Sequence, residues 1–365
     1  MKSVSHLITT IERGGAENQL LVLVQEQISS GWKVEVIPLK GSLDLREELT
    51  LIGAQLNLSL HNKPFLEQLI ILKTGLARSI PFLHAHLPRA ELTAAFVRKR
   101  NTFIFTRHNA EAFMPTRPGI VSIALSRIVT WRACTGIAIS HAVKDFLIQT
   151  REVSKNYDLR VIHYGYYVRN KVNSKSNSLT NYQKSLSSHV FKVGMIGRLV
   201  PQKDYPTLLK AFTKFSIHAP ASTLQILGSG YLESELKKLS IELGIDKRVD
   251  WVGKTPNVFH YLENFDLFVL TSSYEGFGLV LLEAMDAGVP ILASRNSAIP
   301  EVMGEHFPGL FETSNVDELA NKMLEVFSEA ETHDKNLEIF AERLNTFGAS
   351  NMWKAVENAY TRIRA

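Results

Sequence analysis

The chain has 365 residues, of which 45% are hydrophobic and 21% charged, and its formal net charge is +5. At ordinary domain sizes this length predicts two globular domains, each with its own core. No apolar run approaches the roughly 20 residues that span a bilayer, and the N-terminus lacks the apolar stretch and cleavage site of a secretory signal. The single cysteine, Cys134, excludes an internal disulfide and a cysteine-based zinc cage, so we expect a cytoplasmic protein.

Short apolar runs alternate with helical periodicity along the first half of the chain. The predicted strands are Val4–Thr9, Lys33–Pro38, Phe82–Ala85, Thr102–Thr106 and Gly136–Ile139. The predicted helices between them include Ala16–Ser30, Lys63–Leu76 and Ala90–Arg100. Strands that alternate with helices form parallel βα units, so we expect an open, doubly wound α/β sheet.

The composition changes abruptly at residues 169–189. Thirteen of these 21 residues are Ser, Asn or Lys, which is typical of a linker. Strand–helix alternation then resumes, with strands expected at Val190–Ile196, Leu224–Leu227, Val249–Val252, Leu267–Leu270 and Pro290–Ala293. We therefore predict a Rossmann-like domain over 1–168, a linker over 169–189, and a second Rossmann-like domain over 190–349 that faces the first across a cleft. Residues 350–365 are predicted to form a helix that either closes the second domain or crosses back onto the first.

Charge is unevenly distributed along the chain. Residues 1–180 hold 23 of the 41 Lys and Arg but only 13 of the 36 Asp and Glu, so the remainder is net negative. A basic N-terminal half favours an anionic partner, either a phosphorylated acceptor or an anionic membrane leaflet, although a solvated basic surface has the same pattern. The candidate membrane contacts are Arg98-Lys99-Arg100 and Phe65–Leu72. Nucleic acid is not expected, because no binding motif is present.

The most informative segment follows the predicted strand Leu267–Leu270. A turn rich in glycine holds Glu275, and the helix that begins near Phe277 or Gly278 and ends at Gly288 carries Glu283. Ligands of open α/β sheets bind beyond the carboxyl ends of the strands, where glycine amides and a helix N-terminus attract anions. Taken alone, two carboxylates at this spacing also fit an ordinary βα loop with an exposed Glu and a helical salt bridge.

A longer pattern surrounds this segment. It comprises Tyr274-Glu275-Gly276-Phe277-Gly278, Glu283-Ala284-Met285, Gly288-Val289-Pro290 and Pro300-Glu301-Val302. Other segments that agree in order are Gly14-Gly15-Ala16-Glu17, Gly194 to Tyr205, Leu227-Gly228-Ser229-Gly230 and Val252-Gly253-Lys254-Thr255. Together they resemble family 4 of the retaining glycosyltransferases, which use nucleotide sugars and have the GT-B fold. The resemblance covers nearly the whole chain and is strongest over 190–305.

The resemblance implies a donor site in the C-terminal domain. Arg198 and Lys203 would bind the diphosphate without a metal, since two cations suffice and no Asp-x-Asp pair is present. Glu275 would contact the transferred sugar, and Glu283 the ribose hydroxyls. The other donor-binding residues would be Gly15, Gly228, Gly253, Lys254, Thr255, Gly276, Phe277, Gly278 and Leu279.

The implied catalytic set is Glu275, His108, Arg198 and Lys203, with His108 near the reacting sugar. One residue departs from the family pattern. Asp204 stands where the family usually has glycine, and its charge would partly neutralise Lys203.

The N-terminal domain is expected to bind the acceptor, with Arg13, Gly14, His86 and Asn109 as candidate contacts. His84 and His86 share one strand face, a pair that hints at a metal but lacks obvious further ligands. We therefore expect no metal and no other cofactor.

The implied reaction is retaining transfer of a hexose from a UDP-sugar, or next a GDP-sugar, to a glycan or lipid-linked acceptor. Such transfer would serve the synthesis of cell-surface polysaccharide, lipopolysaccharide or another glycoconjugate, with the protein cytoplasmic or peripheral on the inner membrane face. Two alternatives stay open: a sugar-nucleotide epimerase of the same architecture, and a non-catalytic donor-binding regulatory subunit.

Overall fold

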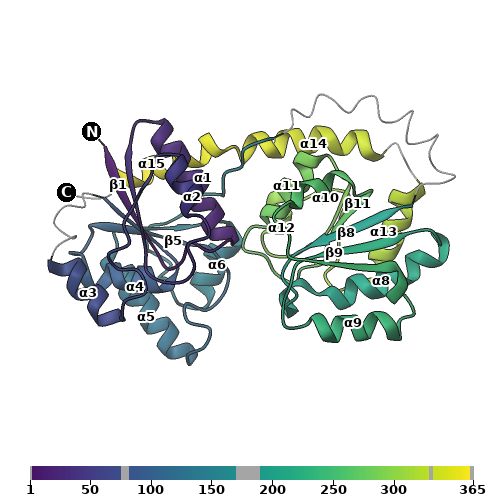
Figure 1. Cartoon of the computed structure of the whole chain (residues 1–365), viewed down its shortest axis with the longest axis horizontal. Helices are drawn as coiled ribbons and strands as arrows, with labels where there is room; N and C mark the ends of the chain where they lie inside the picture. Colours follow the sequence, from purple (N-terminus) through teal and green to yellow (C-terminus); the bar gives the residue numbers. More distant parts are fainter. Residues whose placement is uncertain (1, 75–81, 170–189, 329–331, 362–365) are drawn as a thin grey trace. The chain divides into compact units, whose positions relative to one another are not determined.

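The computed structural model describes residues 2–74, 82–169, 190–328 and 332–361. The predicted linker therefore lies outside the described residues, apart from Arg169. The chain divides into two compact units, Met1–Tyr167 with Phe347–Ala365, and Val168–Thr346. Each unit is a parallel sheet covered by helices (Figure 1). Within the described ranges, no helix is both long enough and apolar enough to cross a bilayer.

The first unit contains a seven-stranded sheet in the order β3-β2-β1-β4-β5-β6-β7, in which all neighbours are parallel. Its strands are β1 (Ser3–Ile8), β2 (Lys33–Pro38), β3 (Gln55–Leu56), β4 (Leu83–His86), β5 (Phe103–Arg107), β6 (Thr135–Ala138) and β7 (Leu159–Val161). Its helices are α1 (Gly15–Ser29), α2 (Arg46–Leu51), α3 (Phe65–Thr74), α4 (Pro88–Val97), α5 (Gly119–Arg132), α6 (His141–Gln149) and α15 (Ala349–Tyr360).

These helices cover both faces of the sheet. Helix α1 contacts α2 and α15, whereas α4 contacts both α3 and α5. Right-handed crossovers from β1 to β2 and from β4 to β5 run in opposite directions across the sheet, so α1 and α4 lie on opposite faces (Figure 1).

Helix α15 belongs to the first unit although it follows the whole second unit in the sequence. Its apolar positions, Trp353 and Tyr360 among them, are buried in the core formed by β1, α1 and Trp32. Trp353 also donates from Nε1 to the Ser30 hydroxyl over 2.8 Å. The sequence left open whether this helix closes the second domain or crosses back onto the first. In the structure it packs on the first unit.

The second unit contains a six-stranded sheet in the order β10-β9-β8-β11-β12-β13, also parallel throughout. Its strands are β8 (Lys192–Ile196), β9 (Thr223–Leu227), β10 (Val249–Gly253), β11 (Leu267–Leu270), β12 (Ile291–Ser294) and β13 (Leu310–Phe311). Its helices are α8 (Tyr205–His218), α9 (Glu233–Glu242), α10 (Val258–Glu263), α11 (Leu279–Ala287), α12 (Ile299–Met303), α13 (Val316–Ser328) and α14 (Thr332–Thr346).

The predicted strands agree with the structure to within about two residues, and β2 and β11 have the predicted bounds. Helix α4 begins at Pro88, earlier than the predicted Ala90, because proline at the first helical position needs no backbone N–H partner. The short strands β3, β7 and β13 were not predicted, since two or three residues are too few to show a period.

Each sheet has a point where the strand order reverses, between β1 and β4 in the first unit and between β8 and β11 in the second. Loops that leave the carboxyl ends of two such strands diverge to opposite faces, and the crevice between them is where ligands of open α/β sheets bind. The two reversal points therefore define where a site is expected in each unit.

Candidate functional site

Glu275 lies in the loop that leaves β11 at the reversal point of the second sheet. Its side chain is buried, and its Oε1 atom accepts from the Ser272 hydroxyl over 2.7 Å and from Lys203 Nζ over 2.5 Å. The loop ends at Gly278, whose φ of 88° belongs to the left-handed region that glycine adopts without strain. Helix α11 then runs to the left-handed Gly288, so both glycine boundaries predicted for this helix are observed.

Ser297 holds the backbone of Glu275 from the β12 side. Its hydroxyl accepts from the Glu275 amide over 2.7 Å and donates to the Glu275 carbonyl over 2.8 Å. The Asn296 amide donates to the Ser273 carbonyl in the same loop. No pattern in the sequence identified Ser297, because its role depends on two loops that meet only in the folded sheet.

Lys203 approaches Glu275 from the loop that leaves β8, the other strand at the reversal point. Two hydrogen bonds to backbone carbonyls join the two loops. The Thr271 hydroxyl donates to the Lys203 carbonyl over 2.8 Å, and the Ser273 amide donates to the Gln202 carbonyl over 2.8 Å. Lys203 and Glu275 thus form an ion pair at the carboxyl edge of the sheet, where the donor site was predicted.

Arg198 follows the same strand, and its side chain is exposed. Within the described parts of the chain it makes no side-chain hydrogen bond or ion pair. An exposed guanidinium with five donors is chemically suited to a diphosphate.

Asp204 forms no ion pair with Lys203 among the described residues. Its carboxylate instead accepts from the Thr207 hydroxyl over 2.8 Å and from the Ser314 hydroxyl over 2.7 Å. The partner of Lys203 is Glu275. Asp204 has φ 46° and ψ 48°, a left-handed conformation that glycine adopts freely and most other residues do not. This backbone conformation explains why the family pattern has glycine at this position.

The glycine turns after β8, β9 and β10 lie side by side along the same edge. The Gly197 amide donates to Leu227 over 2.9 Å, and the Gly228 amide donates to Gly253 over 2.8 Å. A Cβ atom on Gly228 would stand 1.9 Å from the Gly197 carbonyl oxygen, so only glycine fits there. Lys254 is exposed and Thr255 half-exposed at the end of this row of turns.

Glu283 is half-buried on α11. Burial raises its pKa to about 7, and the positive charge of Arg169 opposes that rise. A carboxyl with this pKa changes its charge near neutral pH, where a neighbouring ligand can shift the balance. The sequence placed Glu283 on the helix but had no signal for its burial.

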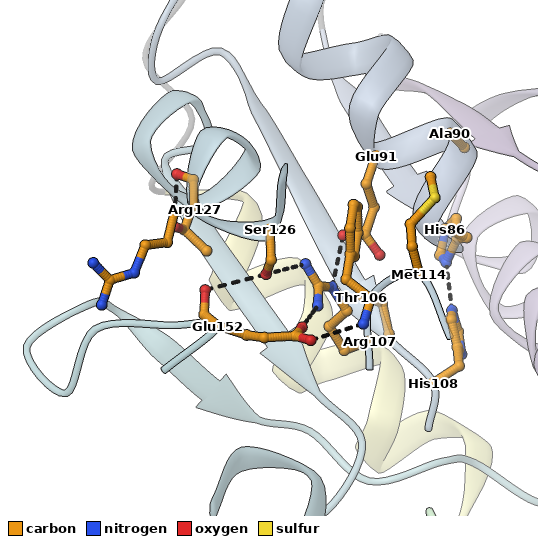
Figure 2. Close-up of polar contacts among 12 residues, drawn as sticks. His86, Ala90, Glu91, Thr106, Arg107, His108, Met114, Ser126, Arg127 and Glu152 are labelled. Carbon is orange, nitrogen blue, oxygen red and sulfur yellow. Dashed lines mark hydrogen bonds and ion pairs between the residues drawn. The ribbon is translucent and has the colours of Figure 1, made fainter. Parts of the chain in front are cut away.

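His108 follows β5 in the first unit, and both of its ring nitrogens have partners. Nδ1 lies 2.7 Å from the Tyr164 hydroxyl. Nε2 lies 3.1 Å from Nδ1 of His86, a contact that Figure 2 shows. Burial lowers the pKa of His108 to about 3, so the ring is neutral at physiological pH. His86 and His108, assigned separately from the sequence, are thus in direct contact.

His6, His84 and His86 lie on neighbouring strands at the reversal point of the first sheet, with ligand atoms within 4.8 Å of one another. Three imidazoles at this separation have the chemistry of a zinc or copper site. Each of their six nitrogens, however, lies within hydrogen-bond distance of a neighbour, the partners being Gln27, Tyr360, Thr106, His108 and the rings themselves. A metal would have to displace several of these bonds.

Arg107 forms a buried network that the sequence did not reveal (Figure 2). Its guanidinium donates to Glu91 over 2.7 Å, to Glu152 over 3.0 Å and to the Ser126 hydroxyl over 2.9 Å. Glu152 in turn accepts from the amide of Phe113 over 2.7 Å. The network therefore anchors the loop after β5, which also holds the acceptor candidate Asn109. Burial raises the pKa of Glu91 to about 7.

The remaining first-unit candidates lie in the glycine turn after β1 and in the loop after β5. Arg13 pairs with Glu48 on the surface, and Asn109 donates to Glu111 over 3.0 Å. Gly14 precedes α1, and a Cβ there would stand 2.5 Å from an oxygen of Glu17. The turn containing Gly14 and Gly15 leaves β1 at the reversal point of the first sheet, but Arg13 and Asn109 already have acidic partners.

Two Rossmann-like α/β units of this kind, with acidic and basic residues at the reversal point of the second, have the architecture of the GT-B glycosyltransferases. Family comparison gives the same result. Residues 13–168 match the family described as "Glycosyltransferase Family 4", and residues 181–342 match the family described as "Glycosyl transferases group 1". The chain belongs to this family of glycosyltransferases.

Several relatives and one solved structure illustrate the similarity. N-acetyl-alpha-D-glucosaminyl L-malate synthase of Bacillus anthracis is 26% identical over 70% of this chain and 67% of its own length. UDP-Gal:alpha-D-GlcNAc-diphosphoundecaprenol alpha-1,3-galactosyltransferase of Escherichia coli is 31% identical over 43% of this chain and 40% of its own length. The structure of HepE from Anabaena in complex with UDP-glucose has a TM-score of 0.80 at 20% identity, covering 99% of this chain and all of that one.

Proposed function

We propose that this glycosyltransferase moves a hexose from a UDP-sugar, with retention of anomeric configuration, to a glycan or lipid-linked acceptor of cell-surface polysaccharide or lipopolysaccharide synthesis. The observation that carries the proposal is the Lys203–Glu275 pair at the reversal point of the second sheet. The donor preference is supported by the UDP-galactose donor in the name of the Escherichia coli relative and by the UDP-glucose in the HepE complex, and GDP-sugars are the next candidates.

In this proposal, Lys203 and Glu275 have different roles in donor binding. An arriving diphosphate offers Lys203 a more highly charged partner than one carboxylate, and Arg198 supplies a second cation. Glu275, released from Lys203, accepts hydrogen bonds from hydroxyls of the sugar. The two cations then stabilise the negative charge that grows on the leaving phosphate, which makes a metal unnecessary in this proposal.

Retention is proposed from the family resemblance. As the bond from the anomeric carbon to the phosphate oxygen breaks, the acceptor oxygen bonds to that carbon on the same face. The departing phosphate oxygen takes the acceptor's hydroxyl proton, so the products are the glycoside and the protonated nucleoside diphosphate. This route needs no enzymatic nucleophile.

A membrane contact is proposed for the face of the first unit covered by α3, α4 and α5. Its exposed apolar side chains, each at least 50% accessible, are Leu66, Ile70, Phe96, Ile120 and Trp131. Two cations lie beside the last of them, with the Arg100 and Arg132 guanidinium groups 5.0 Å and 5.9 Å from the Trp131 ring centre. Apolar side chains among cations suit the anionic inner leaflet of the cytoplasmic membrane, where a lipid-linked acceptor would be found.

The proposal is tested by calorimetry with UDP-, GDP- and ADP-sugars, each with and without EDTA, followed by transfer assays on the donor that binds. Glu275→Gln should lower kcat by about 100-fold or more while donor affinity changes by less than about tenfold, because the proposed contact is to the sugar. Glu242→Gln, at an exposed position on α9, is the matched control and should leave both unchanged. Binding of no donor, epimerisation without acceptor, unchanged turnover of Glu275→Gln, or loss of activity in EDTA would each contradict a stated part.

A further inference from the structure

Three buried histidines of the first unit, His6, His84 and His86, and the partly buried His108 belong to one continuous hydrogen-bonded chain. The chain runs through eight side chains in the order Tyr164, His108, His86, His6, Gln27, Tyr360, His84 and Thr106. Its seven contacts span 2.7 to 3.1 Å, the range of good hydrogen bonds. Five of its members come from β1, β4, β5 and the loop after β5, and Gln27 and Tyr360 come from α1 and α15.

Each histidine ring in this hydrogen-bonded chain is neutral at physiological pH. Burial lowers the pKa of His6 to about 4 and that of His108 to about 3, and it lowers the pKa values of His84 and His86 well below the ordinary value. A neutral imidazole has one N–H donor and one acceptor nitrogen. The tautomer of each ring is therefore determined by the partner at either of its nitrogens.

Gln27 is the member whose two ends differ chemically, because an amide oxygen only accepts and an amide nitrogen only donates. Its oxygen lies 2.8 Å from His6 Nε2, which must then carry the proton. His6 Nδ1 accepts from His86 Nε2, and His86 Nδ1 accepts from His108 Nε2. His108 Nδ1 is left to accept from the Tyr164 hydroxyl.

The other end of the Gln27 amide determines the second branch. Its nitrogen donates to the Tyr360 hydroxyl over 2.9 Å, so that hydroxyl directs its own proton to His84 Nδ1. His84 then donates from Nε2 to the Thr106 hydroxyl over 2.7 Å. All four histidines consequently have the proton on Nε2, and every bond in the chain points the same way.

We propose that Gln27 is a positioning residue for His108: its amide couples the two branches, places all four rings in the Nε2–H tautomer, and so makes His108 Nδ1 a hydrogen-bond acceptor. Any hydroxyl that replaces Tyr164 at this nitrogen must donate to it. Chains in which each group both donates and accepts also strengthen their bonds cooperatively. Only the link from His108 to the reacting sugar rests on the proposed function.

The test is nitrogen NMR of the full chain labelled with ¹⁵N-histidine, in which long-range proton–nitrogen correlations report the tautomer of each ring. Signals are assigned by the loss of one ring in each single His→Gln variant. The expected spectrum at neutral pH shows Nε2–H at residues 6, 84, 86 and 108. A spectrum with Nδ1–H at any of these rings, with a charged ring among them, or with the shifts of a bound metal would overturn the proposal, whether or not any variant folds.

A matched pair of variants tests the role of Gln27 itself. Gln27→Met removes the amide that joins the branches, and at least His6 and His84 should then show mixed tautomers. Gln68→Met is the control, because Gln68 is equally buried and bonds to the Leu39 and Leu60 carbonyls but to no histidine. Unchanged tautomers in Gln27→Met, or the same change in both variants, would contradict the coupling.

Activity is measured separately so that the two proposals can fail independently. If His108 serves the transfer reaction, Gln27→Met should lower kcat by roughly tenfold relative to Gln68→Met at equal folded fraction. Equal kcat values alongside the expected spectra would leave the hydrogen-bonded chain in place and remove His108 from the proposed reaction.

Discussion

Lys203 and Glu275 were assigned to different parts of the donor, the diphosphate and the sugar, yet in the structure they form an ion pair with each other. Both side chains are largely buried, and a buried charge left without its partner is strongly destabilising. For that reason Glu275→Gln, which keeps the shape and can still accept from Lys203, tests the chemistry more cleanly than Glu275→Ala.

Glu283 gives the donor site a predicted pH dependence. Its pKa is raised to about 7 in the folded protein, so the neutral form is favoured below pH 7 and the folding stability it contributes is lost as pH rises through 7. The ionised form is the stronger acceptor for ribose hydroxyls. We therefore expect UDP-glucose affinity to rise between about pH 6 and pH 8, with a proton released on binding near pH 7.

The measurement is calorimetry in buffers that differ in ionisation enthalpy, with a nucleotide sugar rather than UDP because it lacks a terminal phosphate that titrates in this range. Glu283→Gln should bind more weakly and show no pH dependence between these limits. An unchanged pH dependence in this variant would assign the effect to another group.

We predict that Asp204 affects folding stability through its left-handed backbone and does not affect donor binding through its charge. Asp204→Gly and Asp204→Ala both lose the side-chain bonds to Thr207 and Ser314, but only Asp204→Gly removes the strain of the left-handed backbone. Asp204→Gly should therefore be more stable than Asp204→Ala by about 1 kcal/mol in the free energy of unfolding. Both variants should bind the donor with the affinity of the unmodified protein. Tighter binding in both would show that the negative charge of Asp204 weakens the interaction of Lys203 with the donor.

At the scale of elements, Arg107 ties β5 to α4, to α5 and to the loop that follows β5. Arg107→Met leaves Glu91 and Glu152 buried without their cation, and we expect the free energy of unfolding to fall by about 3–5 kcal/mol. Urea unfolding measures the loss. Restoring neutrality with Glu91→Gln and Glu152→Gln should recover part of it, since the cost comes mainly from unpaired charge.

An exposed ion pair of the same unit is the control for the buried Arg107 network. Lys2 and Glu357 pair over 2.8 Å on the surface, where solvent screens the charges. Lys2→Met should cost less than about 1 kcal/mol. Equal losses for Lys2→Met and Arg107→Met would contradict the importance given to burial.

At the scale of the whole molecule, the uneven charge leads to a prediction about membranes. The chain should co-sediment with vesicles containing anionic lipid at about 50 mM salt and much less at about 500 mM, because the Debye length shortens over this range. Trp131→Ser with Ile120→Ser should weaken binding. Leu51→Ser is the control, since Leu51 is 84% exposed on α2, which covers the opposite face of the sheet. If the double variant and the Leu51→Ser control weaken vesicle binding equally, or if binding does not depend on salt, the proposed membrane contact through α3, α4 and α5 is contradicted.

Much of the second unit could be read from the sequence because its signals are local. Glycines that allow left-handed turns, apolar strands and the helix start at Gly278 each depend on a few neighbouring residues, and their order matched a family. The family and its fold followed from that order. The bounds of β11 and α11 were predicted for the same reason.

The tertiary structure alone decided which side chains meet. Lys203 and Glu275 are 72 residues apart, and Gln27 and Tyr360 are 333 apart, so no local pattern could pair them. Burial gave Glu283 its raised pKa, a left-handed backbone explained Asp204, and the return of α15 completed the histidine chain. Sequence by itself determined the class of the protein through short-range backbone geometry, whereas the partners and charges within its sites depend on long-range packing.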